Sequence, residues 1–165
     1  MPNLSQLLPH AAIYVTLGTL ALLAVVLRSP RLMLQDFPKS IQDAVPPKTE
    51  AEKRLSVRWG LPFILILLCY PFLATFLFKS QSAEPPGFAS LFLFAFGIAF
   101  AFNLWDLLVL DWLLLCTITP SWAIVPGTEG NPGSKDYAFH FRGFLIGSLL
   151  SAAIAVIVAA VVGFL

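Results

Sequence analysis

The longest apolar run of the chain, residues 88–119, contains one amide and two carboxylates: Asn103, Asp106 and Asp111. Carboxylates inside a membrane helix are costly, by about 2.5–3.5 kcal/mol at the helix centre, and they commonly mark proton or cation sites. Asn103 and Asp106 are three residues apart and share one face of an α-helix. Asp111 is turned by about 140° from Asp106 on an ideal α-helix, so the two carboxylates are not expected side by side.

Basic groups that could neutralise these carboxylates precede the last apolar run of the chain. We predict that Asp106 or Asp111 pairs with His140 or Arg142, near the membrane interface. Together with Asn103, these residues form the predicted polar cluster. Two interpretations stay open: an ion pair that locks the helices together, and a proton or cation site that uses Asp106, Asn103 and His140.

Catalytic and metal-binding motifs are not recognisable in this sequence. It contains no His-Glu-x-x-His pattern, no Ser/His/Asp order and no cluster of cysteine with histidine. Cys69 and Cys116 lie apart in apolar runs, as buried apolar side chains commonly do. We therefore expect no metal, no cofactor and no catalytic residue, and we favour a non-enzymatic function.

The composition indicates that the solvent of this chain is lipid. Hydrophobic residues make up 58% of it and charged residues 12%, against roughly 25% charged in soluble domains. Four apolar runs can cross a bilayer core of about 30 Å, at residues 9–27, 59–78, 88–110 and 143–165. We predict an all-α polytopic membrane protein, a bundle of four transmembrane helices that forms one integral membrane domain, residues 1–165.

Two polar loops, residues 28–58 and 120–142, separate these spans. In the first, Phe37, Ile41 and Val45 repeat every four residues, which predicts a short helix lying on the cytoplasmic membrane surface. Thr49 and Glu52 match a capping box, so a second helix should begin near Glu50 and continue into the membrane.

Positive charge is distributed unevenly over the connecting segments. The two polar loops hold nine of the ten lysines and arginines, and the short hairpin after residue 78 holds only Lys79. Because cytoplasmic loops are enriched in Lys and Arg, both polar loops should be cytoplasmic and both termini outside. We expect a multi-pass protein of a bacterial cytoplasmic membrane.

The last span carries a small residue at every fourth position, along one helix face. This packing strip consists of Gly143, Gly147, Ser151, Ala155, Ala159 and Gly163. Such strips let two membrane helices pack closely, either within one chain or between two copies.

Three classes of function fit these features. We expect a non-enzymatic membrane subunit or scaffold that acts by helix–helix packing. The first alternative is a small oligomeric transporter or channel that uses Asp106, Asn103 and His140. The second is an interfacial membrane enzyme, which would require Asp106, His140 and Arg142 to converge. The expected partners are the lipid bilayer and either a second copy or another membrane protein, without nucleic acid.

Overall fold

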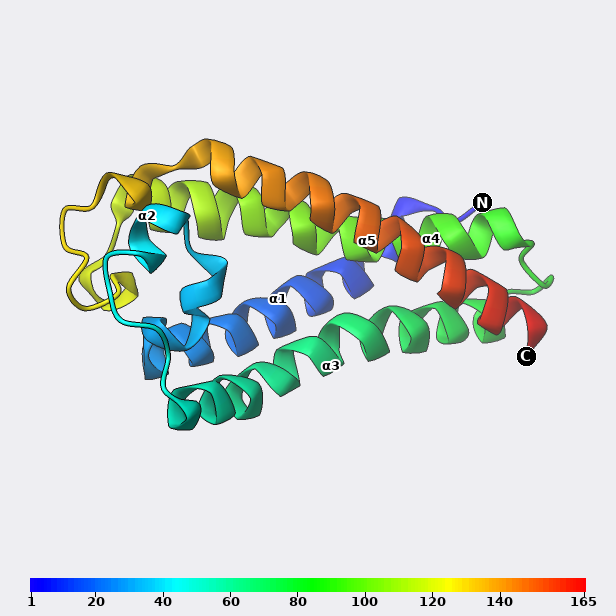
Figure 1. The fold of residues 1–165 in the computed structure, drawn as a ribbon. Helices are drawn as coiled ribbons and strands as arrows, with labels where there is room; N and C mark the ends of the chain where they lie inside the picture. The colour runs from blue at the N-terminus through cyan, green and yellow to red at the C-terminus, as the bar shows by residue number, and fades with distance from the viewer.

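The computed structural model describes all residues, 1–165, and consists of helices without strands (Figure 1). Four long helices are each apolar and long enough to cross a membrane. They are α1 (Leu4–Arg28), α3 (Glu50–Gln81), α4 (Phe88–Trp105) with its continuation η2 (Asp106–Ile118), and α5 (Tyr137–Phe164). The predicted all-α architecture with four apolar helices is therefore confirmed.

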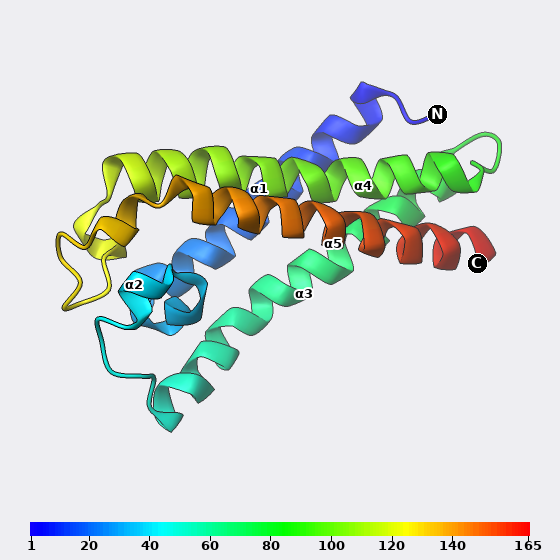
Figure 2. The same ribbon diagram turned by 45° about the horizontal axis from the view of Figure 1, so that its top comes forward.

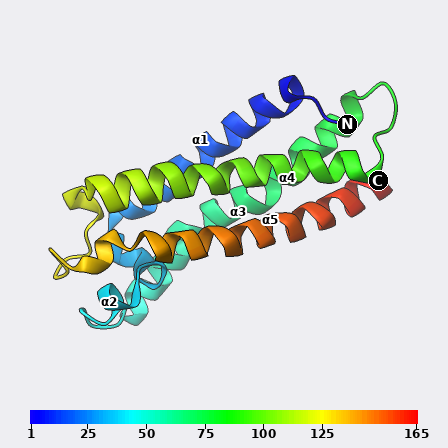
Figure 3. The ribbon, with the colours of Figure 1, turned by 90° about the horizontal axis from the view of Figure 1, so that it is seen from above.

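The four helices alternate in direction, so both chain termini lie at one end of the bundle (Figures 1 and 3). Segments 29–49 and 119–136 lie at the opposite end. Nine of the ten lysines and arginines lie in these segments or in the helical turns next to them, and we call this end the basic end. Lys79 lies at the other end, where its Nζ donates a hydrogen bond to the carbonyl of Val162 at 3.0 Å.

Two helices begin earlier than the apolar pattern predicts, because polar residues cap them. Asn3 and Gln6 form a capping box that starts α1 at Leu4. The Asp136 side chain accepts a hydrogen bond from the backbone of Phe139 at 2.9 Å and starts α5. His140 and Arg142 consequently belong to the first turns of α5, and not to a loop as expected.

The first polar loop folds into a 3₁₀ helix, η1 (Pro30–Asp36), and a four-residue helix, α2 (Lys39–Gln42). Both lie between α3 and the α4–α5 pair, since α3 diverges from that pair toward the basic end (Figure 2). The predicted membrane-surface helix is not found. Its apolar stripe faces the protein, because Ile41 packs with Leu34 and with Val125 of the second loop in a small separate core.

Four aromatic side chains pack against one another in the middle of the bundle, and we call them the aromatic layer: Tyr14, Phe63, Tyr70 and Phe102. Tyr70 stacks on Tyr14 with ring centroids 5.5 Å apart, and Tyr14 meets Phe102 edge-on at 5.7 Å. Phe63 packs against Phe102 at 5.8 Å. The Tyr14 hydroxyl donates a hydrogen bond to the carbonyl of Leu67 at 3.1 Å. The layer thereby joins α1, α3 and α4.

The packing strip of α5 faces α4 of the same chain, and these two helices lie side by side along their length (Figure 3). Its most buried members are Ser151, Ala155 and Ala159. A Cβ atom at Gly147 would lie 2.3 Å from Oδ1 of Asn103, whereas one at Gly143 would meet no atom within 4 Å. At Gly147 the strip therefore lets α4 and α5 pack closely, whereas at Gly143 there is space for a side chain.

Replacing Thr49 by alanine should destabilise the protein by about 1 kcal/mol, because the hydroxyl caps α3. The hydroxyl accepts a hydrogen bond from the backbone of Glu52 at 3.2 Å, and the Glu52 carboxylate accepts one from the backbone of Thr49 at 2.7 Å. Thermal unfolding in detergent measures the loss. Thr16→Ala, at an exposed hydroxyl within α1, is the control and should change little; equal stability of both variants would refute the capping role.

Candidate functional site

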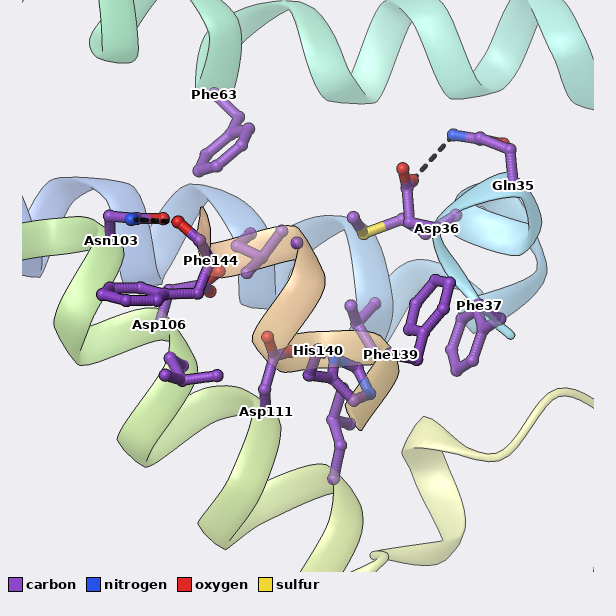
Figure 4. Close-up of a pocket in the computed structure, with 16 residues that line it drawn as sticks. Gln35, Asp36, Phe37, Phe63, Asn103, Asp106, Asp111, Phe139, His140 and Phe144 are labelled. Atoms are coloured by element: carbon purple, nitrogen blue, oxygen red, sulfur yellow. Dashed lines mark hydrogen bonds and ion pairs between the residues drawn. The ribbon is translucent and has the colours of Figure 1, made fainter. Parts of the chain in front are cut away.

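A cavity of about 390 Å³ lies inside the basic end of the bundle, and we call it the acidic cavity (Figure 4). Its volume falls within the range of about 300–1,000 Å³ that is usual for ligand sites. Apolar side chains, including Leu22, Phe63 and Phe144, make up most of its wall. The polar lining consists of Gln35, Asp36, Asn103, Asp106, Asp111 and His140.

The helix that carries Asp106 and Asp111 changes from α to π geometry at Asp106. The Thr119 backbone donates to the carbonyl of Leu114 at 2.9 Å, five residues earlier, as π geometry requires. Residues five apart lie above one another in such a helix, so Asp106 and Asp111 share one face and both line the acidic cavity. The expectation that the two carboxylates diverge is therefore wrong, because it assumed an ideal α-helix.

Asp111 lies beside His140, one of the two partners that the sequence predicted for the acids. Its Oδ1 lies 3.0 Å from Nδ1 of His140, which is only 8% exposed. The early start of α5 turns His140 toward η2, whereas Arg142 remains exposed, forms no ion pair and does not line the cavity. The structure thus brings Asp111 and His140 together and separates Arg142 from the other members of the polar cluster.

Asp106 has no such partner. Its carboxylate faces the acidic cavity and accepts no hydrogen bond from any protein group, and no lysine, arginine or histidine lies within ion-pair distance of it. Figure 4 shows Asp106 and Asp111 extending from the same helix toward α5. An ionised carboxylate in a largely apolar surrounding is stabilised when it binds a proton or a cation.

Asn103 connects α4 to α5. Its Nδ2 donates hydrogen bonds to the carbonyl of Phe144 at 3.0 Å and to Oγ of Ser148 at 2.9 Å. These bonds use both amide hydrogens, so Asn103 acts as a positioning residue that holds Asp106 against α5. Its predicted place on the same face as Asp106 agrees with the cavity that both residues line.

Two lining residues, Gln35 and Asp36, were not predicted from the sequence. They belong to η1, which folds back under the helices, and Gln35 donates from Nε2 to the Asp36 carboxylate at 2.8 Å. The surrounding protein displaces water and raises the pKa of the Asp36 carboxyl, an effect that Lys48 and this hydrogen bond oppose. A carboxylate in a polar loop gives no indication in the sequence that it faces a cavity.

The geometry limits the chemistry of the acidic cavity. No three His, Cys, Asp or Glu side chains are arranged to hold a metal ion. Asp106 and Asp111 can take up a proton or bind a cation between them, and His140 can exchange a proton with Asp111. Comparisons of the chain with protein-family models, with characterised proteins and with solved structures find no match.

Proposed function

We propose that this chain is a small membrane transporter that binds a proton or a small cation between Asp106 and Asp111. The observation that carries the proposal is the Asp106 carboxylate, which faces the acidic cavity without any protein donor. A carboxylate that served only to lock helices would be expected to have a basic partner, as Asp111 has in His140. Ionisable residues within membrane helices commonly mark substrate and proton pathways.

The proposed setting is a bacterial cytoplasmic membrane, with all residues in one integral membrane domain. The distribution of Lys and Arg supports a cytoplasmic position for the basic end and an outside position for both termini. The acidic cavity would then receive its ligand from the cytoplasmic side. As partners we propose the lipid bilayer and a second copy of the chain or another membrane protein.

A pure scaffold function has less support, although the packing strip first favoured it. The packing strip suggested a helix partner outside the chain. It packs instead against α4 of the same chain. An interfacial enzyme also has less support, since Arg142 does not join Asp106 and His140 at the cavity. The acidic cavity, by contrast, supports a function that includes binding of a ligand.

Flux measurements in liposomes test the proposal. Purified protein is reconstituted with a pH-sensitive or cation-sensitive dye inside, and a gradient of protons, sodium or potassium is applied in turn. One of these ions should enter faster than in empty liposomes, and Asp106→Asn should reduce the rate to the empty-liposome level. Glu129→Gln, in the second loop outside the cavity, is the matched control and should retain the flux. Unchanged flux in Asp106→Asn, or no flux of any of these ions, would overturn the proposal.

A further inference from the structure

A second cavity of about 550 Å³ adjoins the acidic cavity. It lies between α1, η1 and the first turns of α3, where α3 diverges from the rest of the bundle (Figure 2). The two cavities share five lining residues, Leu22, Met33, Gln35, Asp36 and Phe63. Nothing in the proposed ion site uses this second space, so it requires its own explanation.

Three charged side chains line the second cavity. Lys53 pairs with Glu50 at 2.8 Å, whereas Lys48 and Asp36 form no ion pair. Lys48 donates from Nζ to the carbonyl of Leu32 at 2.9 Å, to Oγ of Ser56 at 3.1 Å and to Oε1 of Gln35. The other end of the Gln35 amide donates to Asp36. Gln35 therefore stands between the ammonium and the carboxylate and keeps both charges facing the cavity.

This separation leaves both charges with an electrostatic cost. All three acceptors of Lys48 are neutral, and burial lowers the pKa of Lys48 while it raises the pKa of Asp36. A ligand with an anionic group at Lys48 and a cationic group at Asp36 would offset both costs. A purely anionic ligand would satisfy the lysine and be repelled by the carboxylate.

The remainder of the cavity is apolar and follows the start of the apolar stretch of α3. Lys53 lies at its polar end, and Leu61 and Ile64 lie further along the same helix. Both of these apolar side chains are about half exposed, so the cavity continues onto the outer surface of a helix long and apolar enough to cross a membrane. A ligand that fills the cavity must carry charged groups at one end and hydrocarbon at the other.

We propose that the second cavity binds a zwitterionic membrane lipid with a primary amine. Its phosphate lies at Lys48 and Lys53, its ammonium group lies at Asp36, and its hydrocarbon follows Leu61 and Ile64. Basic pockets between membrane helices on the cytoplasmic side commonly bind lipid headgroups. The nearby carboxylate adds selectivity for an amine, since a primary ammonium donates hydrogen bonds that a quaternary one cannot.

Native mass spectrometry tests this inference on the purified full-length protein. The protein is incubated with an equimolar mixture of phosphatidylethanolamine and phosphatidylglycerol, and the retained lipid is counted. Phosphatidylethanolamine should be retained preferentially. Asp36→Asn should reduce that preference by about tenfold, as expected for the loss of one hydrogen bond between charged groups. Lys53→Gln and Lys48→Met should reduce retention of both lipids.

Lys39→Gln is the matched control, because Lys39 is an exposed basic residue of the same loop and lines neither cavity. Lys48→Met could loosen η1, whereas Asp36→Asn and Lys53→Gln leave the bonds of Lys48 to Leu32 and Ser56 in place and allow the test without that risk. Equal retention of the two lipids, or an unchanged preference in Asp36→Asn, would overturn the inference. Displacement of bound lipid by free phosphoethanolamine would overturn the lipid source and indicate a soluble zwitterion. Because no step involves Asp106, failure of the flux experiment leaves this result unaffected.

Discussion

Asp106→Asn is expected to stabilise the protein, by about 1–3 kcal/mol at neutral pH. The substitution removes a carboxyl group that accepts no hydrogen bond and forms no ion pair, and asparagine keeps nearly the same shape. It also relieves repulsion from Asp111, which π geometry places on the same face. Thermal unfolding in detergent without added cations should show the higher midpoint.

The stability of Asp106→Asn shows whether Asp106 is a ligand-binding residue or a structural one. A variant that is more stable and inactive in the flux experiment has lost a group kept for function. Glu84→Gln, in the exposed hairpin between α3 and α4, is the control and should not change the midpoint. A clear loss of stability in Asp106→Asn would mean that the carboxylate holds the helices together, and the ion-binding proposal would lose its main support.

Gly147→Val is expected to destabilise the protein by about 3 kcal/mol or more, the combined effect of overpacking and lost hydrogen bonds. A Cβ atom alone would lie 2.3 Å from Oδ1 of Asn103. Asn103 cannot turn aside freely, because Nδ2 is held by Phe144 and Ser148. The substitution therefore separates α4 from α5 or breaks the bonds that position Asp106. Thermal unfolding and flux should both decrease.

Gly143→Ala provides the control within the same strip. It is four residues away on the same helix face, and its added Cβ would meet no atom within 4 Å. Alanine favours the helix over glycine by about 1 kcal/mol, so this variant should be as stable as the wild type or more so. Similar destabilisation of both variants would show that the whole strip packs against another chain, in contrast to the contact with α4 described above.

The four long helices could be predicted because each contains an apolar stretch that is long enough to cross a membrane. Their ends were less predictable where capping side chains add turns, as at Asn3 and Asp136. In the first polar loop, the cap at Thr49 was predicted correctly. Ile41 was expected at the membrane surface, and it packs inside the protein. Periodicity identifies an apolar stripe, but only tertiary structure shows that Val125, far away in the sequence, covers it.

The candidate site was predictable in its residues and less so in its geometry. Charge and similar depth were sufficient to predict that Asp106 or Asp111 pairs with His140 or Arg142, but not that the contact joins Asp111 to His140. The relation of Asp106 to Asp111 depended on helix type, and nothing in the Leu-rich segment between them distinguishes π from α winding. Asp36 enters the cavity through the fold of η1, which is set by tertiary contacts such as the bond from Lys48 to Leu32.

The aromatic layer has a consequence for how an ion could pass through this molecule. On α3 and α4, the cavity-lining residues farthest from the basic end are Phe63 and Asn103. Phe102 is the residue before Asn103 and packs against Phe63, and Tyr14 and Tyr70 continue the aromatic layer beyond them. If Asp106 binds an ion as proposed, that ion would reach the basic end of the bundle and not the opposite end. Release to the other compartment requires these rings to part, and each aromatic contact adds about 0.5–1.5 kcal/mol beyond its buried area. The slow step of a transport cycle would then be a rearrangement of rings rather than the release of the ion from its carboxylate.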